Sequence, residues 1–190
     1  MGLIPHAIIQ VLFQRGAFEA LDTQNTSLAL LVYAAGLPAF VLNKVFSPGF
    51  FAREDTMTPL RYAAVSVAVN IAASITLFQF YAFAGIAAGT TIAAWVNAGL
   101  LGLTLARRGG FVPDAQVLTR LPLILVASGA MGAALWYGAL YAAPYFEGTF
   151  LESVAALAAL ILGGMIAYAG LAQATGAVSL ATLRRSFMRR

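Results

Sequence analysis

The chain has 190 residues, of which 61% are hydrophobic and only 9% are charged, with a net charge of +4 and no cysteine. So few polar residues cannot cover the surface of a water-soluble domain, and the composition therefore excludes an ordinary soluble protein. The lack of cysteine also excludes a disulfide framework and any thiolate metal or redox site.

The chain begins with residues 1–26, which precede the first long apolar window. Within them, the stretch from Met1 to Phe13 is apolar, too short to cross a membrane, and lacks the basic start of a signal peptide. We expect it to be the end of a preceding helix, followed by a periplasmic segment that carries Arg15. We also expect the chain to be the C-terminal portion of a longer protein. The only histidine, His6, is a lone donor and predicts no metal site.

Five apolar windows follow, each long enough to cross a hydrocarbon core of roughly 30 Å as a helix. They are rich in Ala and Leu on all faces, whereas the strands of a β-barrel would be short and would alternate in polarity. The predicted fold class is therefore an all-α integral membrane protein with five transmembrane helices. The windows are residues 27–46, 61–81, 84–106, 120–141 and 151–173.

The stretch from Lys44 to Pro59 contains four charges and two prolines in an otherwise mostly apolar chain. Ser-Pro-Gly at 47–49 predicts the end of the first helix, and Thr-Pro at 58–59 predicts the start of the second. Between them, Arg53 stands beside Glu54 and Asp55, so we expect a local ion pair that holds the loop in one shape.

Glycine and proline interrupt two of the windows. Pro38 follows Gly36 in the first and favours a bend, which membrane helices tolerate where protein or water satisfies the freed backbone. The third begins with a GxxxG pattern at Gly85 and Gly89, which allows another helix to approach closely.

Polar side chains inside the windows need partners away from lipid. Asn70 and Ser74 are four residues apart and share one helix face, while Thr90, Thr91 and Asn97 lie on the next helix. Their oxygens could hold a hard cation such as Na⁺ or could simply join the two helices by hydrogen bonds. Neither window contains a carboxylate, and the chain has no paired acids or nucleophile–histidine arrangement that would predict an enzyme.

The basic residues predict the topology. If the helices alternate in direction, every Lys and Arg except Arg15 falls on one side, which the positive-inside rule assigns to the cytoplasm. The N-terminus then lies in the periplasm and the C-terminus in the cytoplasm, and the basic charge reflects topology rather than nucleic-acid binding. The residues on the cytoplasmic side are Lys44, Arg53, Arg61, Arg107, Arg108, Arg120, Arg184, Arg185, Arg189 and Arg190.

The outer end of the fourth helix shows a second membrane signature, a group of rings suited to the interface. These are Trp136, Tyr137, Tyr141 and Tyr145. We divide the chain into residues 1–26, three transmembrane helices at 27–108, and a terminal hairpin with a basic tail at 109–190. The last two helices carry almost no polar side chains, which favours a hairpin that faces lipid.

Two stretches, Val-Leu-Phe-Gln-Arg-Gly-Ala-Phe at 11–18 and Lys-Val-Phe-Ser-Pro-Gly-Phe-Phe-Ala-Arg-Glu-Asp-Thr-Met-Thr-Pro at 44–59, closely resemble the MurJ (MviN) family of lipid II flippases. That family belongs to the multidrug/oligosaccharidyl-lipid/polysaccharide exporter superfamily. The resemblance implies a fourteen-helix fold in which these residues supply helices ten to fourteen. It also implies transport of lipid II from the inner to the outer leaflet of the bacterial inner membrane for cell-wall synthesis.

The resemblance further implies partners and site residues. The partners would be lipid II, membrane lipids and the missing N-terminal half of the transporter, without which the chain is expected to be inactive. No nucleic acid and no cofactor are expected, and Na⁺ coupling stays open. The implied substrate-binding or gating residues are Arg15, Lys44, Arg53 and Asp55. Asn70, Ser74 and Thr90 match the family's cation site, although Ser74 stands where an acid would bind most strongly.

Two alternatives remain at this point. One is an exporter of another polyprenyl-linked oligosaccharide or of a drug, which the charge of the transport cavity would distinguish. The other is a membrane scaffold that transports nothing, for example a partner of cell-wall synthesis enzymes.

Overall fold

The computed structural model describes residues 5–13, 18–109, 115–146 and 149–174. Over these ranges the chain forms helices only, and five of them are long and apolar enough to cross a membrane, which confirms the predicted fold class. The helices are α1 (Pro5–Phe13), α2 (Ala20–Phe51), α3 (Met57–Tyr81), α4 (Phe83–Arg107), α5 (Ala115–Phe146) and α6 (Phe150–Ala174). The chain divides into two compact units, Met1–Val112 and Pro113–Arg190. We call them the N-terminal and the C-terminal unit.

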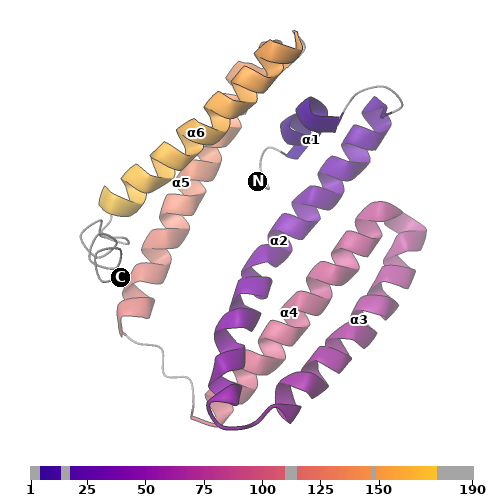
Figure 1. Ribbon diagram of the computed structural model, residues 1–190, viewed down its shortest axis with the longest axis vertical. Coiled ribbons are helices and arrows are strands. Elements are labelled where there is room, and N and C mark those ends of the chain that lie inside the picture. The colour runs from indigo at the N-terminus through magenta and orange to yellow at the C-terminus, as the bar shows by residue number, and fades with distance from the viewer. Residues whose placement is uncertain (1–4, 14–17, 110–114, 147–148, 175–190) are drawn as a thin grey trace. The chain divides into compact units, whose positions relative to one another are not determined.

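In the N-terminal unit, α4 lies between α2 and α3 and packs along both (Figure 1). The short helix α1 packs on α2, and its side chains Ile9 and Val11 are buried. No residue of α3 is buried within the unit. The outer face of α3 is apolar, as a helix surface in contact with lipid requires.

Helix α2 is longer at both ends than its apolar window. At its start, the backbone N–H of Glu19 donates to the Asp22 carboxylate at 3.0 Å, which satisfies a donor at the helix entry. The hydroxyl of Thr23 then donates to the carbonyl of Glu19 at 3.2 Å. These contacts stabilise polar first turns that hydrophobicity alone does not predict.

The predicted end of α2 at 47–49 was wrong, because the helix continues through Pro48 to Phe51. Gly49 and Phe50 lie against α4, where a Cβ added at Gly49 would come 3.1 Å from Leu105. Phe50 is fully buried in a cluster with Leu101 and Leu105. Burial of this apolar turn outweighs the single backbone hydrogen bond that proline removes.

The contact between α3 and α4 confirms the role expected for the GxxxG pattern. A Cβ added at Gly85 would collide with the backbone carbonyl of Leu77, and one at Gly89 would collide with Ser74. Because only glycine fits at these two positions, the backbones of the two helices approach closely along this face.

Hydrogen bonds also join the helices of the N-terminal unit. The hydroxyl of Thr91 donates to the carbonyl of Val32 at 2.9 Å, and the indole N–H of Trp95 donates to the carbonyl of Ala35 at 3.1 Å. Both acceptors lie on α2 just before Pro38, which lacks a backbone N–H. The carbonyl that loses its helical donor at Pro38 is that of Ala34, so these bonds join α4 to α2 close to Pro38 but do not replace the missing one.

In the C-terminal unit, α5 and α6 lie side by side as an antiparallel pair (Figure 1). A Cβ added at Gly164 would come 2.7 Å from Leu135, and one at Gly138 would come 3.0 Å from Leu160. Near the connection between the helices, the hydroxyl of Ser153 donates to the carbonyl of Tyr145 at 3.2 Å. Leucines packed on glycines thus hold this pair together.

Candidate functional site

One end of the N-terminal unit, where α2 and α4 finish and α3 begins, carries several exposed basic residues. We call it the basic end and define it by Lys44, Arg53, Arg61, Arg107 and Arg108. An ion pair between the turn after α2 and the end of α4 brings two of these segments together. The structure confirms that the Lys and Arg side chains between positions 27 and 108 lie at the same end of this unit.

The turn between α2 and α3 has a defined backbone. The N–H of Asp55 donates to the carbonyl of Phe50 at 3.1 Å, and the N–H of Glu54 donates to the carbonyl of Phe51 at 3.0 Å. This pair of bonds is a Schellman motif, in which the residue after the helix adopts a left-handed conformation. Glu54 does so, with φ of 58°. The motif places Asp55 directly before α3.

Asp55 has two structural roles. Its carboxylate accepts hydrogen bonds from the backbone N–H of Thr58 at 3.0 Å and from the hydroxyl of Thr58 at 2.7 Å, which caps the start of α3. The same carboxylate accepts a bond from Arg108 at 2.5 Å. The bond from Arg108, followed by the bonds from Thr58, lowers the pKa of Asp55 from 3.8 to about 2. The carboxylate is therefore ionised at any physiological pH.

The local pairing expected for Arg53 was wrong. The ion pair of Asp55 is with Arg108, and the guanidinium of Arg53 donates instead to the backbone carbonyl of Arg108 at 3.4 Å. The reason is the Schellman turn, which directs Asp55 towards α3 and the end of α4. Sequence reasoning missed Arg108 as a partner, because it is 53 residues away and only its place at a helix end marks it.

The remaining two residues of the expected gating set are Lys44 and Arg15, and among the described residues Lys44 is not part of the contacts around Asp55. Lys44 is exposed on α2, more than a turn before the end of that helix. Arg15 lies outside the described residues. The structure therefore brings together Arg53 and Asp55 of this set and adds Arg108 to them.

The polar residues expected to hold a cation are already hydrogen-bonded. The hydroxyl of Ser74 donates to the Asn70 amide oxygen at 3.0 Å, and the hydroxyl of Thr90 donates to the carbonyl of Ile86 on its own helix at 3.1 Å. Asn97 keeps a buried amide oxygen that has no partner among the described residues.

A hard cation in a protein needs about six converging oxygen ligands, usually with carboxylates among them. The residues of this set are neutral, and the described residues contain no cluster of acids or histidines that could hold a metal. Asn70, Ser74 and Thr90 therefore supply too few ligands to hold a cation by themselves, and the cation site stays a prediction. The bonds of Ser74 and Thr90 lie within α3 and within α4, so they do not join the two helices as the alternative interpretation expected.

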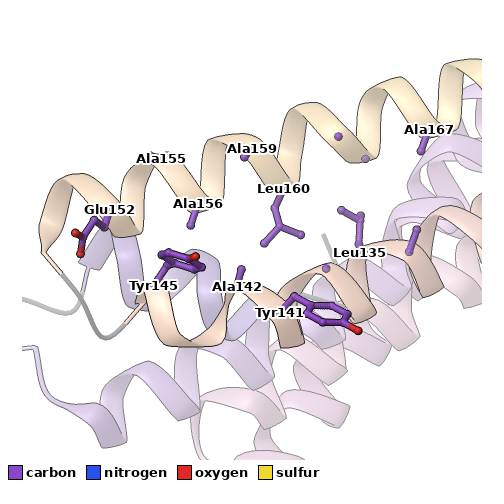
Figure 2. Close-up of a pocket in the computed structure, with 14 residues that line it drawn as sticks. Leu135, Tyr141, Ala142, Tyr145, Glu152, Ala155, Ala156, Ala159, Leu160 and Ala167 are labelled. Atoms are coloured by element: carbon purple, nitrogen blue, oxygen red, sulfur yellow. The ribbon is translucent and has the colours of Figure 1, made fainter.

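The C-terminal unit contains an open groove of about 660 Å³ between α5 and α6. Small side chains form much of its wall, among them Ala142, Ala156 and Ala159. Figure 2 shows Leu135 of α5 and Leu160 of α6 at the groove, between the two backbones. The groove is a narrow apolar surface of a size that accepts small-molecule ligands.

The groove has a charged residue at one end. Glu152 of α6 and Tyr145 of α5 lie at the end where the two helices connect, while Tyr141 lies further along the groove, near Leu135 (Figure 2). The Glu152 carboxylate accepts a hydrogen bond from the backbone N–H of Thr149 at 2.9 Å and so helps to cap α6. The exposed ring of Tyr141 lies beside the groove, in the position expected for a membrane interface.

Comparison with known proteins assigns the chain to a family. The family model described as "Lipid II flippase MurJ" matches residues 1–156. A "Probable lipid II flippase MurJ" of Rhizobium meliloti is 44% identical over 96% of the chain, and one of Rhizobium tropici is 41% identical over 100% of it. A third, from Vibrio cholerae, is 36% identical over 84% of the chain.

These matches cover 34%, 36% and 29% of the three relatives, so the chain spans about a third of the length of the curated relatives it matches. Five membrane-spanning helices and the family match make it a multi-pass membrane protein. The chain belongs to the lipid II flippase MurJ family.

Proposed function

We propose that this chain takes part in moving lipid II, the polyprenyl-linked peptidoglycan precursor, from the inner to the outer leaflet of a bacterial inner membrane. The observation that carries the proposal is the family match over residues 1–156, together with relatives that bear the same name. The proposed activity is that of a transporter. Because the relatives are about three times as long as this chain, we propose that the chain acts together with further helices like those of the relatives.

The physical task is to carry a charged head group through a medium of low dielectric while the lipid tail stays in the bilayer. In our proposal, the groove between α5 and α6 holds part of the polyprenyl chain. Its small apolar side chains support this role, because they leave space for a chain and present few polar atoms to it. The cavity for the charged head group then comes from helices that these residues do not include.

The proposed orientation places the basic end of the N-terminal unit in the cytoplasm. Five exposed basic side chains at one end of the unit support this assignment by the positive-inside rule. The aromatic residues of α5, of which Trp136 and Tyr141 are exposed, then lie at the periplasmic interface. In this orientation the end of the groove that carries Glu152 opens towards the periplasm.

Complementation tests the proposal. Cells depleted of their own lipid II flippase would express the chain alone, or the chain joined to the part of the Rhizobium meliloti relative that it does not match. The intact relative is the positive control. We expect the joined protein to restore growth and outer-leaflet lipid II, and the chain alone to restore neither. A joined protein that is inserted at normal levels but leaves lipid II in the inner leaflet would refute the proposal.

A further inference from the structure

Arg108 connects three parts of the N-terminal unit that are far apart in the sequence. Its guanidinium donates to the Asp55 carboxylate at 2.5 Å and to the Thr58 hydroxyl at 3.4 Å. Its charged carbon lies 5.8 Å from the centre of the Phe50 ring. One side chain at the end of α4 therefore contacts the end of α2, the turn and the start of α3.

The contacts require an arginine. Two guanidinium nitrogens of Arg108 reach two different acceptors, while the central carbon of the group lies over the aromatic ring of Phe50. The ammonium group of a lysine is a point charge that can form the ion pair but cannot make all three contacts in this geometry. A conservative substitution should therefore keep only part of the effect.

A residue of the turn, Arg53, also forms a hydrogen bond with Arg108. The guanidinium of Arg53 donates to the backbone carbonyl of Arg108, which would otherwise be a free acceptor at the end of α4. The turn and the end of α4 thus contact each other through two side chains, one from each segment. Asp55 would continue to cap α3 through Thr58 without either arginine.

The position of the ion pair separates its role from folding stability. The side chain of Arg108 is 44% exposed and that of Asp55 is 23% exposed, so water and salt screen the attraction between them. Exposed pairs of this kind contribute little to the stability of a protein. Their geometry nevertheless fixes where the turn lies against α4.

We propose that Arg108 is a positioning residue, which holds the turn of residues 52–56 against the end of α4 so that the basic ends of α2, α3 and α4 move as one body during transport. The part of this inference that concerns transport rests on the proposed function. The part that concerns the position of the turn does not.

Limited proteolysis tests the position of the turn. Trypsin cuts after Arg53 only when the turn opens, and the rate follows the population of the open form when opening is fast. With the full chain in lipid nanodiscs, we expect Arg108→Gln to raise this rate about fivefold, a typical coupling between contacting side chains. Arg108→Lys should lie between Arg108→Gln and the unchanged protein. Arg107→Gln, which removes the same charge from an adjacent exposed residue, is the matched control and should change nothing.

A double-mutant cycle identifies the partner. Asp55→Asn removes the charge of the carboxylate but keeps an oxygen that can cap α3, so it should open the turn as Arg108→Gln does. The double variant should open the turn no further than Arg108→Gln alone, because that substitution already removes the contact with Asp55. Additive effects, or no effect of Arg108→Gln on cleavage at an unchanged melting temperature, would overturn the inference.

The rate of lipid II transfer is a second measurement, which should not change if Arg108 only stabilises the fold. In the joined protein described above, we expect Arg108→Gln to lower the rate of lipid II transfer about fivefold while the amount and melting temperature of the protein stay the same. Arg108→Lys should recover part of the rate, and Arg107→Gln should leave it unchanged. If the turn opens but transfer does not slow, Arg108 has no role in transport. If the unsubstituted joined protein transfers nothing, the proposed function fails, and proteolysis still decides the position of the turn.

Discussion

The two units of this protein hold their helices together by different means. In the N-terminal unit, α4 contacts its neighbours through glycines and through hydrogen bonds between helices, such as those of Thr91 and Trp95 to α2. In the C-terminal unit, leucines rest on Gly138 and Gly164, and an apolar groove stays open between the helices. Within lipid, hydrogen bonds and close packing are what hold helices together, so we infer that the first unit is the rigid one. The second has surface left for a ligand.

The largest expected effect tests the close packing of the N-terminal unit. Gly89→Leu would place side-chain atoms where the backbone and hydroxyl of Ser74 lie, so α3 could no longer rest on α4. Overpacking of this kind should cost about 3 kcal/mol of folding free energy, measured by reversible unfolding in mild detergent. The matched control is Gly99→Ala on the same helix, because nothing lies within 4 Å of a Cβ at Gly99. Equal losses for both variants would contradict the contrast between the units.

The next prediction tests the open groove of the C-terminal unit. Ala159→Trp would fill the groove between the helices without entering the contacts of Gly138 and Gly164. We expect lipid II transfer by the joined protein to fall about tenfold, since a cost of about 1.4 kcal/mol on the bound chain corresponds to that factor. Leu162→Trp on the same helix is the control, because Leu162 does not line the groove and is exposed. Equal rates for the two variants would show that the groove is not used.

A smaller effect should follow from the loss of one hydrogen bond between helices. Thr91→Val keeps the shape of the side chain but removes the donor to Val32, at a cost of about 1 kcal/mol. Thr76→Val is the control, because the hydroxyl of Thr76 bonds the carbonyl of Ala72 on its own helix. Unfolding of the N-terminal unit, measured by hydrogen exchange of α2 amides, distinguishes the two. If Thr76→Val lowers the free energy of unfolding as much as Thr91→Val, the hydrogen bond between α4 and α2 is not what stabilises the unit.

Substitution of Glu54 by glycine should stabilise the protein, whereas the substitutions above destabilise it or slow transport. Its φ of 58° is unfavourable for any residue with a Cβ, so Glu54→Gly should stabilise the N-terminal unit by about 0.5 to 1 kcal/mol. Glu54→Ala removes the same charge but keeps the Cβ, and should not stabilise. Thermal unfolding measures both. A gain for Ala equal to that for Gly would point to charge rather than backbone conformation.

The smallest effect concerns pH. Because Arg108 and Thr58 lower the pKa of Asp55 to about 2, its interactions are complete above its ordinary pKa of 3.8 and are lost only as the pH falls towards 2. We therefore expect protection of the turn to be constant from about pH 5 to 8. An NMR titration of the Asp55 carboxyl measures the midpoint, and Arg108→Gln should raise it. A midpoint near 3.8 in the unsubstituted chain would show that the ion pair does not form.

The sequence by itself determined the fold class, the five spans and the shared end of the basic residues between positions 27 and 108. These features follow from hydrophobicity and charge along the chain, because apolar segments enter the hydrocarbon core and basic residues stay on one side of it. The close approach at Gly85 and Gly89 could also be predicted, because the absence of two side chains on one helix face is a local property.

Only the tertiary structure decided which polar groups meet. Asp55 pairs with Arg108 rather than with the adjacent Arg53, because a Schellman turn and the packing of Phe50 on α4 set its direction. Ser74 lies against Gly89 of α4, a contact that the spacing of polar residues along α3 does not reveal. The extension of α2 through Pro48 has the same origin. In each case the outcome depends on a partner distant in sequence, and hydrophobic pattern and spacing contain no information about such a partner.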